Sequence, residues 1–407
     1  MTKTLLIVSG GVQALHGIRR AKELGYRVVV SDLNPNAPGF AAADDHFLAS
    51  TYDAAETLAA AEHYHQTVCK IDGVITIGCD VPLTVATVAE RLDLPGIPLE
   101  AARLAQDKLA MKQRFAETGV PVPWFSALGD AEQLRRFAKQ RDYRLVVKPV
   151  DSRGSRGVQR LQAGMDLAAV FETAAKQSPT RRVMVEEFLD GPQISTESIL
   201  IDSEGVTPGF SDRNYEFIER YAPYFIENGG DLPSHLDERT QTAVKLTAEA
   251  AGRALGVSKG NIKGDIVVAN GRPYVIELAA RASGGYFCTR EIPLNTGVDF
   301  IGAVIKLALG ERVDPADLQP KRQTPIVQRY AFPAPGRVSR IVGLEEARRL
   351  SGIEEIVVTV SPGDEILEPK HSGCTAAMVL ATGNSVSAAR ANAAAALNTL
   401  RIETVRA

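Results

Sequence analysis

Residues 146–158 read VVKPVDSRGSRGV, and the interpretation of the middle of the chain depends on this stretch. A short apolar run ends at Lys148 and Pro149 prevents a helix from continuing, so the run predicts a buried strand. The loop that follows contains four small residues, Ser152, Gly154, Ser155 and Gly157. Glycines let backbone N–H groups approach a phosphate closely, and a lysine adds positive charge. The stretch therefore predicts a phosphate-binding loop of a kind other than GxxxxGK[ST], which is absent; an ordinary hairpin loop is the alternative.

A β-hairpin is predicted further along by Asn270-Gly271, a dipeptide that favours tight two-residue turns. Its arms, GDIVVA and PYVIEL, are apolar except for one acid in each, Asp265 and Glu277. A carboxylate in such a setting needs a cation, because an unpaired buried charge is costly. Two facing carboxylates that bind Mg2+ together with phosphate oxygens meet this need. Pairing of an acid with Lys263 or Arg281 is the alternative.

An arginine follows the second acid in the segment ELAARASGG, residues 277–285. Arg281 lies four residues after Glu277 and just before Ser283-Gly284-Gly285. An arginine beside a metal-binding acid is well placed to hold a transferring phosphoryl group or the oxyanion of an acyl phosphate. We therefore predict Arg281 as a catalytic residue, with a structural salt bridge as the alternative.

Two weaker features complete the central region. Asp107-Lys108 lies near the start of a helix predicted over residues 106–118, where a lysine by itself is usually a solvated surface charge. VEEFLDG, residues 185–191, is a predicted strand that runs into a polar turn. Such a turn can offer backbone N–H and C=O groups to an adenine edge, with Phe188 or Leu189 against the ring. A plain strand end is the alternative.

The first hundred residues alternate between strand and helix. Apolar strands are predicted at residues 4–8, 26–31 and 73–77, with helices at 12–24 and 54–64. This alternation predicts a parallel sheet with helices on both faces. The turn SGGVQALHG lacks the full G-x-G-x-x-G pattern, so we predict an ordinary turn and not a pyridine-nucleotide site.

The fold class predicted for the whole chain is a combination of α/β and α+β. LPGIP, residues 94–98, punctuates the chain and closes the first domain. The last part of the chain reads as another α/β unit, with an alanine-rich helix predicted over residues 386–402. We predict an N-terminal α/β domain at residues 1–100 and a C-terminal domain at residues 316–407. Between them lies a predicted central domain at residues 101–315, with a small lobe at about 120–190 and a large lobe at about 191–315.

Composition narrows the classes of function. The chain has 407 residues, 45% of them hydrophobic and 23% charged, with a net charge of −3, so it has no basic excess that would favour nucleic acid or an anionic membrane. No run approaches the ~20 apolar residues of a membrane span. The four dispersed cysteines fit reduced thiols, and the six histidines form no metal-binding pattern. We therefore expect a soluble cytoplasmic protein.

The order of the central features resembles the ATP-grasp family over about residues 1–310. The shared elements are DK, KP with a Ser/Gly loop, EEFL, an acidic strand and E-x-x-x-R. The final unit, with GRVSRI, a Pro-Gly-Asp turn and a Ser-Gly segment, is similar to the C-terminal domain of ATP-grasp L-amino acid ligases. This resemblance implies an ATP-grasp fold and an ADP-forming carboxylate–amine ligase that uses ATP and Mg2+ (or Mn2+). It also implies small-molecule substrates, amino acids first among them, and a homodimer.

The resemblance also assigns roles to matched positions. Lys108, Lys148 and Lys263 would reach the phosphates, with the loop 152–157 as a lid. The adenine pocket would be lined by Glu186, Glu187, Phe188 and Leu189. The ribose would contact Gln193, where several relatives have an acid, or Glu197. The metal would be bound by Asp265 and Glu277, whereas Ala279 stands where the family often has a third, asparagine ligand.

Residues 211–234 are aromatic and charged, and are interrupted by Gly229-Gly230 and Pro233. In similar ligases this stretch and the segment after Arg281 enclose the substrate, so Glu227 would hold an amino group and Arg281 a carboxylate or acyl phosphate. Ser283, Gly284 and Gly285 would complete that site. A surface excursion is the alternative for 211–234. For the whole chain, the alternatives are an ATP-grasp enzyme with a bicarbonate or formate acceptor and an ATP-binding protein without catalysis.

Overall fold

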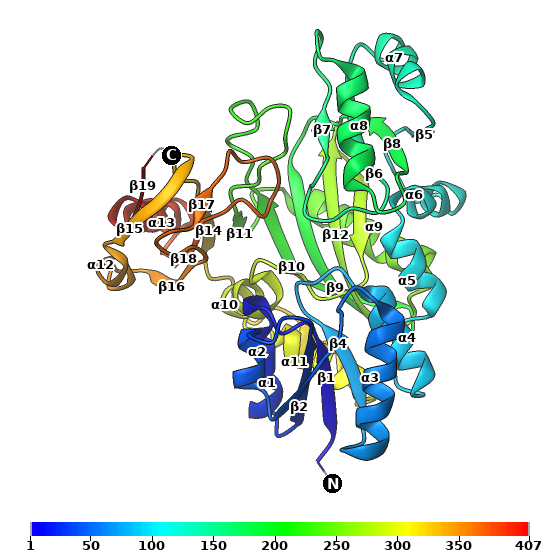
Figure 1. Cartoon of the computed structure of the whole chain (residues 1–407), viewed down its shortest axis with the longest axis vertical. Coiled ribbons are helices and arrows are strands. Elements are labelled where there is room, and N and C mark those ends of the chain that lie inside the picture. The colour runs from blue at the N-terminus through cyan, green and yellow to red at the C-terminus, as the bar shows by residue number, and fades with distance from the viewer. Residues whose placement is uncertain (1, 406–407) are drawn as a thin grey trace. The chain divides into compact units, whose positions relative to one another are not determined.

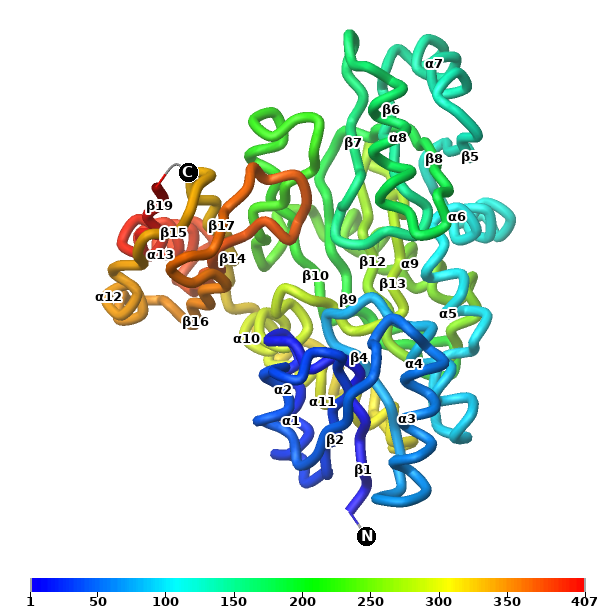
Figure 2. Tube along the Cα trace, in the orientation of Figure 1, coloured from blue at the N-terminus to red at the C-terminus, as the bar shows by residue number. Residues whose placement is uncertain are grey.

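The computed structural model describes residues 2–405, and contacts between Cα atoms divide the chain into two compact units (Figures 1 and 2). Unit 1 consists of Met1–Val122, Ser195–Phe210 and Leu236–Arg322. Unit 2 consists of Pro123–Ile194, Ser211–His235 and Gln323–Ala407. Each unit is assembled from three separate stretches of chain. The domain boundaries predicted after residues 100 and 315 follow sequence order, and they stay a prediction.

Unit 1 begins with the predicted parallel sheet, which is confirmed. In spatial order its strands are β3 (Asp45–Leu48), β2 (Arg27–Asp32), β1 (Thr4–Val8) and β4 (Gly73–Thr76). The helices and the short 3-10 turn that belong to this layer are η1 (Val12–Ala14), α1 (Leu15–Glu23), α2 (Pro38–Ala42), α3 (Ala54–Thr67), α4 (Pro82–Arg91) and α11 (Phe300–Ala308). Figure 1 shows α1 and α11 on one side of the sheet and α3 and α4 on the other. The fully buried β1 strand gives this layer its core, as a continuous apolar run predicts.

The second part of unit 1 is built on the predicted hairpin. In spatial order the strands here are β13 (Arg272–Ala279), β12 (Gly260–Ala269), β9 (Gln193–Ile201) and β10 (Glu204–Arg213). Of β9 and β10, only residues 195–201 and 204–210 belong to unit 1. Asn270 and Gly271 have φ of 50° and 73°, the left-handed conformation that a tight hairpin turn requires. Further helices of the unit are α9 (Glu238–Ala254), which packs on β12 and β13, α10 (Ile292–Thr296), the π-turn η2 (Phe287–Glu291) and η3 (Pro315–Leu318).

The helix predicted over residues 106–118 is confirmed as α6 (Lys108–Glu117), which begins two residues later than predicted. A separate helix, α5 (Leu99–Gln106), ends just before it. Asp107 between them is extended, and its carboxylate accepts a hydrogen bond from the N–H of Ala110 at 2.8 Å. This is the geometry of an N-cap, so Asp107 ends one helix and begins the next. Lys108 consequently lies in the first turn of α6.

Unit 2 contains a small antiparallel sheet with two helices. Its strands in spatial order are β5 (Phe125–Leu128), β8 (Val183–Glu187), β6 (Leu145–Pro149) and β7 (Gln159–Arg160). The helices α7 (Ala131–Gln140) and α8 (Leu167–Gln177) pack together on it, and their apolar residues form one core with the strands. Lys148 lies on β6 and the loop 152–157 connects β6 to β7, as the sequence predicted.

The C-terminal part of unit 2 has two antiparallel sheets. One contains β11 (Gly230–Leu232), β14 (Ile326–Ala331), β18 (Ala377–Thr382) and β16 (Ile353–Val358), and the other β17 (Glu365–Ile366), β15 (Gly336–Val342) and β19 (Arg401–Val405). The helices are α12 (Leu344–Arg348) and α13 (Val386–Thr399). The predicted helix over 386–402 was therefore wrong at its end, because residues 401–405 pair with β15 as a strand.

Candidate active site

The β12–β13 hairpin places the two predicted metal acids side by side. Asp265 and Glu277 are direct cross-strand partners, so both side chains lie on one face of the hairpin. Their side chains are 20% and 35% exposed. The strands are apolar in sequence, yet the two carboxylates lie at a surface where a ligand can reach them.

Each of these acids forms an ion pair with a lysine. The Nζ of Lys263 pairs with Asp265, which also accepts a hydrogen bond from Ser195 at 3.4 Å. The Nζ of Lys108 lies 3.2 Å from Glu277 Oε1. Asp265 therefore forms the ion pair with Lys263 that the sequence left open as an alternative. Two carboxylates and two ammonium groups balance one another, so a divalent cation is favoured there once phosphate oxygens bring further negative charge.

A metal site made of protein ligands alone is absent from residues 2–405, where no cluster of three or more His, Cys, Asp and Glu side chains could hold an ion. Ala279, opposite Lys263 in the hairpin, adds no ligand. Asp265 and Glu277 nevertheless fit an ion that shares its coordination with phosphate oxygens and water, as Mg2+ usually does.

Arg281 is held by a residue that the sequence analysis missed. Its Nε and Nη2 lie 2.6 and 2.5 Å from Asp80 Oδ1, and its Nη1 donates to the carbonyl of Ala282 at 3.3 Å. Burial lowers the pKa of Arg281, but the charge and hydrogen bond of Asp80, together with the charges of Glu197 and Glu277, hold the pKa above its ordinary value. Asp80 follows β4, and an acid in the loop after a parallel strand is a signal that sequence reasoning can use.

The segment 283–285 is held by two side chains from other elements. The N–H of Ser283 donates to Glu197 Oε1 at 2.6 Å, and the N–H of Gly285 donates to Gln13 Oε1 at 3.1 Å. A Cβ on Gly284 would lie 2.4 Å from the same Gln13 oxygen, so a larger residue there would require the Gln13 side chain to move. Two N–H groups of the segment are therefore already used in fixing its shape.

Glu197 is completely buried, and a ribose contact would need an exposed group. Its Oε2 atom has no hydrogen-bond partner within residues 2–405. Burial raises the pKa of Glu197 to about 7, against the lowering effects of the bonds from Ser283 and of the charges of Arg281 and Lys263. Glu197 therefore supports the segment 283–285 through its bond with Ser283, and the ribose contact predicted for Gln193 or Glu197 stays a prediction.

We expect Glu197→Gln to make thermal stability less dependent on pH. The pKa of Glu197 is raised from 4.5 to about 7, so the folded state keeps a proton that the unfolded chain loses. The stability of the folded state that depends on the protonated Glu197 carboxyl is fully present below pH 4.5, and it is lost as the pH rises through 7. A glutamine stays neutral and still accepts from Ser283. The variant should match the wild type near pH 5 and melt a few degrees higher at pH 8; a melting-temperature difference that is the same at both pH values would contradict this.

The predicted nucleotide residues of unit 2 are grouped on β6 and β8. Lys148 and Glu186 form an ion pair between these strands, with side chains only 6% and 3% exposed. The N–H of Glu187 donates to the carbonyl of Trp124 at 2.8 Å, and that of Phe188 donates to the carbonyl of Arg144 at 2.9 Å. Arg160 lies over the Phe188 ring at 4.4 Å. Glu186, Glu187 and Phe188 are thus fixed in place, and Leu189 follows in the turn after β8.

We expect Lys148→Met to destabilise unit 2 by about 3–5 kcal/mol, because it leaves a buried carboxylate without its cation. The double variant Lys148→Met/Glu186→Leu should recover most of this loss, since it removes both charges. Lys176→Met is the control, because Lys176 forms an exposed pair with Glu172 and should lose less than ~1 kcal/mol. Urea unfolding measures all three. A double variant as unstable as Lys148→Met would contradict the ion pair as the cause.

The loop 152–157 has the backbone that the sequence predicted for close approach to a ligand. Gly154, Ser155 and Gly157 have φ of 60°, 61° and 75°. The base of the loop is fixed by Asp151, whose carboxylate accepts hydrogen bonds from the hydroxyls of Ser178 and Thr180 at 2.5 and 2.6 Å. The loop therefore has a defined shape in this structure.

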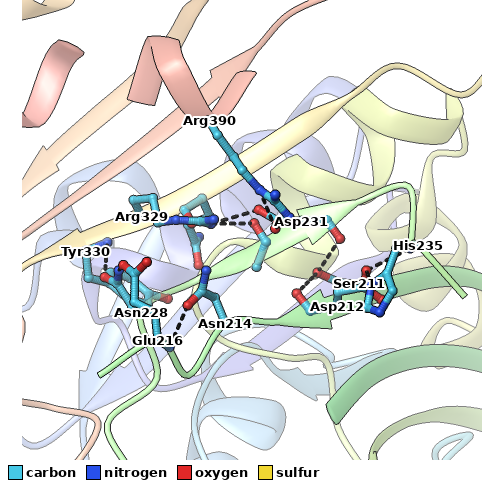
Figure 3. Close-up of polar contacts among 12 residues, drawn as sticks. Ser211, Asp212, Asn214, Glu216, Asn228, Asp231, His235, Arg329, Tyr330 and Arg390 are labelled. Atoms are coloured by element: carbon cyan, nitrogen blue, oxygen red, sulfur yellow. Dashed lines mark hydrogen bonds and ion pairs between the residues drawn. The ribbon is translucent and has the colours of Figure 1, made fainter. Parts of the chain in front are cut away.

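The stretch 211–234, predicted as a substrate wall or a surface excursion, is built into unit 2 by polar contacts (Figure 3). Asp231 on β11 is buried and pairs with Arg329 of β14 at 2.8 Å and with Arg390 of α13 at 2.6 Å. Glu227 pairs with Arg213 at 2.5 Å. The stretch is therefore anchored, and Glu227 is a fixed, half-buried carboxylate.

Comparisons with known families match two parts of the chain. Residues 105–285 match the ATP-grasp domain family, and residues 329–405 match the L-amino acid ligase C-terminal domain 2. None of the helices in the part of the chain that the structure describes is long and apolar enough to cross a membrane.

The proteins to which this chain is similar include two curated proteins and one solved structure. The uncharacterized protein y4rH of Sinorhizobium fredii is 27% identical over 327 residues, which cover 79% of this chain and 62% of that protein. A D-alanine--D-alanine ligase of Desulforudis audaxviator is 29% identical over 198 residues, 46% of this chain and 63% of that protein. The chain thus spans about six tenths of both relatives. The structure of an L-amino acid ligase from Bacillus licheniformis has a TM-score of 0.83 and 22% identity, over 100% of this chain and 99% of that one. The predicted ATP-grasp fold is confirmed.

Proposed function

We propose that this chain, which belongs to the ATP-grasp proteins with an L-amino acid ligase C-terminal domain, is an ATP-dependent ligase that joins a carboxylate to an amine. The proposed substrates are amino acids and the products are an amide, ADP and phosphate. The main support is the pair of facing acids, Asp265 and Glu277, with a lysine on each. This arrangement of charges suits a metal–phosphate complex, and Arg281 belongs to the same unit.

In unit 1, Asp265 and Glu277 would hold Mg2+, which supplies positive charge to the phosphate oxygens when it is bound. Lys108 and Lys263 would then be released from the acids toward the phosphates. Arg281, fixed by Asp80, would stabilise the negative charge that develops on the transferring phosphoryl group. The rigid segment 283–285 would hold the substrate carboxylate next to it.

In unit 2, Lys148 and the loop 152–157 would bind phosphate groups, and residues 186–189 would contact the adenine. Gln193 would meet the ribose. Glu227 would attract the ammonium group of an amino acid, because its own position is fixed by Arg213. Glu227 would play both roles at once, because one carboxylate oxygen can accept from Arg213 and the other from the ammonium group.

The proposed reaction has two steps. A carboxylate oxygen of the substrate attacks the γ-phosphorus of ATP, the bond to ADP breaks, and an acyl phosphate forms. The amine nitrogen then attacks the acyl carbon, a proton leaves the nitrogen, and phosphate departs with the electrons of the C–O bond. Positioning and electrostatic stabilisation account for the rate in such a scheme, so no nucleophilic side chain is required.

The proposal is tested by phosphate release from Mg-ATP in the presence of all pairs of amino acids, with mass spectrometry of the products. We expect ADP, phosphate and a dipeptide in equal amounts for at least one pair. Asp265→Asn is the control, because it keeps the side-chain volume and should abolish release. ADP formation with bicarbonate or formate alone, or ATP binding without ADP across the panel, would reject the ligase in favour of the other two interpretations.

A further inference from the structure

The tip of the loop 152–157 lies against a turn from the C-terminal part of unit 2, residues 371–374. The N–H of Ser372 donates to the carbonyl of Gly154 at 3.1 Å. The hydroxyls of Ser372 and Ser155 form a second hydrogen bond at 3.2 Å. Although 217 residues separate the two serines, both belong to one compact unit.

The turn that carries Ser372 is stabilised by its own hydrogen bonds. The N–H of Gly373 donates to Nδ1 of His371 at 3.1 Å, and the N–H of Cys374 donates to the carbonyl of His371 at 3.2 Å. The sulfur of Cys374 lies 3.5 Å from Nε2 of the same ring. A hydrogen bond accepted by Nδ1 requires the neutral form of the ring, with its proton on Nε2.

The environment of His371 favours that neutral form. Burial, and then the charge of Arg156 from the loop, lower the pKa of His371 below its ordinary value. The turn therefore keeps its hydrogen bonds at neutral pH and presents the backbone N–H and hydroxyl of Ser372 in a fixed direction.

The loop needs a contact of this kind, because part of it is conformationally unfavourable. Ser155 has a side chain and yet a φ of 61°, in the left-handed region that residues other than glycine seldom adopt. Asp151 fixes the base of the loop, as described above, but it does not reach the tip. Ser372 contacts the tip at Gly154 and at Ser155, the residue with the unfavourable backbone.

We propose that Ser372 is a positioning residue, which holds the loop 152–157 in the conformation that binds phosphate. The inference rests on the proposed function, because it takes the loop to be a phosphate site. Its consequence is that the segment 329–405, which matches the L-amino acid ligase C-terminal domain 2, takes part in shaping the nucleotide site. A loop that is already ordered binds its ligand more tightly than one that must first be ordered.

The test is hydrogen exchange of the full-length protein without nucleotide, followed by mass spectrometry of peptides that cover residues 150–158. The N–H groups of Arg156 and Val158 donate to Arg153 and Ser155 within the loop, so their exchange reports its opening. Ser372→Ala removes one hydrogen bond and should speed this exchange about fivefold. Ser372→Thr keeps the hydroxyl and should restore it. The matched control is Ser339→Ala, whose hydroxyl donates to the Glu403 carbonyl in the same part of the chain.

A second measurement uses the non-hydrolysable analogue Mg-AMP-PNP. Its Kd should rise about three- to fivefold in Ser372→Ala and return to the wild-type value in Ser372→Thr. Unchanged exchange in Ser372→Ala, or equally fast exchange in Ser339→Ala, would overturn the proposal. If the wild type does not bind the analogue, the proposed function fails, whereas the exchange result still decides whether Ser372 holds the loop.

Discussion

Glu277→Gln is expected to reduce ATP turnover at least ~100-fold, since a metal ligand contributes several kcal/mol to charge stabilisation in such reactions. The substitution keeps the size of the side chain and its ability to accept a hydrogen bond from Lys108. It removes the negative charge that would bind Mg2+ beside Asp265. Because the side chain is 35% exposed at the hairpin surface, the fold should tolerate the change.

The measurement is phosphate release with the substrate pair found in the screen, at several Mg2+ concentrations. The half-maximal Mg2+ concentration should increase along with the loss of rate. Glu345→Gln is the matched control, because Glu345 is an exposed acid on α12 that pairs with Arg348 of the same helix at 2.6 Å. Wild-type turnover in Glu277→Gln would remove this residue from the metal site.

Arg281→Lys should reduce amide formation about 100-fold, in the range seen when a donor to a developing oxyanion is lost. Lysine keeps the positive charge but lacks the planar fork, so one group cannot both bond to Asp80 and face the phosphoryl group. Asp80 bonds to both Nε and Nη2 of Arg281, and these two contacts fix the orientation of the guanidinium group. Asp80→Asn should cause a smaller loss in the same step, as expected for a positioning residue.

This prediction is checked by the rate of amide formation together with the Kd for Mg-AMP-PNP. The rate should fall while nucleotide affinity changes little, because Arg281 is assigned to the transferring group. Arg340→Lys serves as the control, since Arg340 has a comparable two-point contact with Glu403 in an exposed setting. Amide formation within twofold of the wild type in Arg281→Lys would contradict the catalytic role.

The sequence predicted those elements that depend on local pattern. Asn270-Gly271 identified the hairpin because the turn conformation is a property of the dipeptide itself. The regular register of a two-residue hairpin would place Asp265 opposite Ile276. An irregularity between Asp265 and Ile266 shifts the register and brings Asp265 opposite Glu277, so the facing of the two acids did not follow from the turn alone. The strands of the N-terminal sheet were predicted for a similar reason, since strands buried on both faces read as continuous apolar runs.

Errors occurred where local signals compete. The helix predicted over residues 106–118 begins two residues later than expected, at Lys108, because Asp107 is its N-cap. The alanine-rich C-terminal helix was extended too far because RIETV has no strong breaker before it. Pairing with β15 makes this stretch a strand, which is a tertiary effect.

The sequence by itself determined which chemical groups this protein has, their order, and the local hairpin and loop that carry them. Tertiary structure alone decided their partners. Asp80 is 201 residues from Arg281, and Ser372 is 217 from Ser155, so no local pattern connects either pair. The burial of Glu197 likewise depends on the elements that pack over it. Short-range geometry follows from neighbouring residues, whereas the partner and solvation of a charge follow from packing between distant parts of the chain.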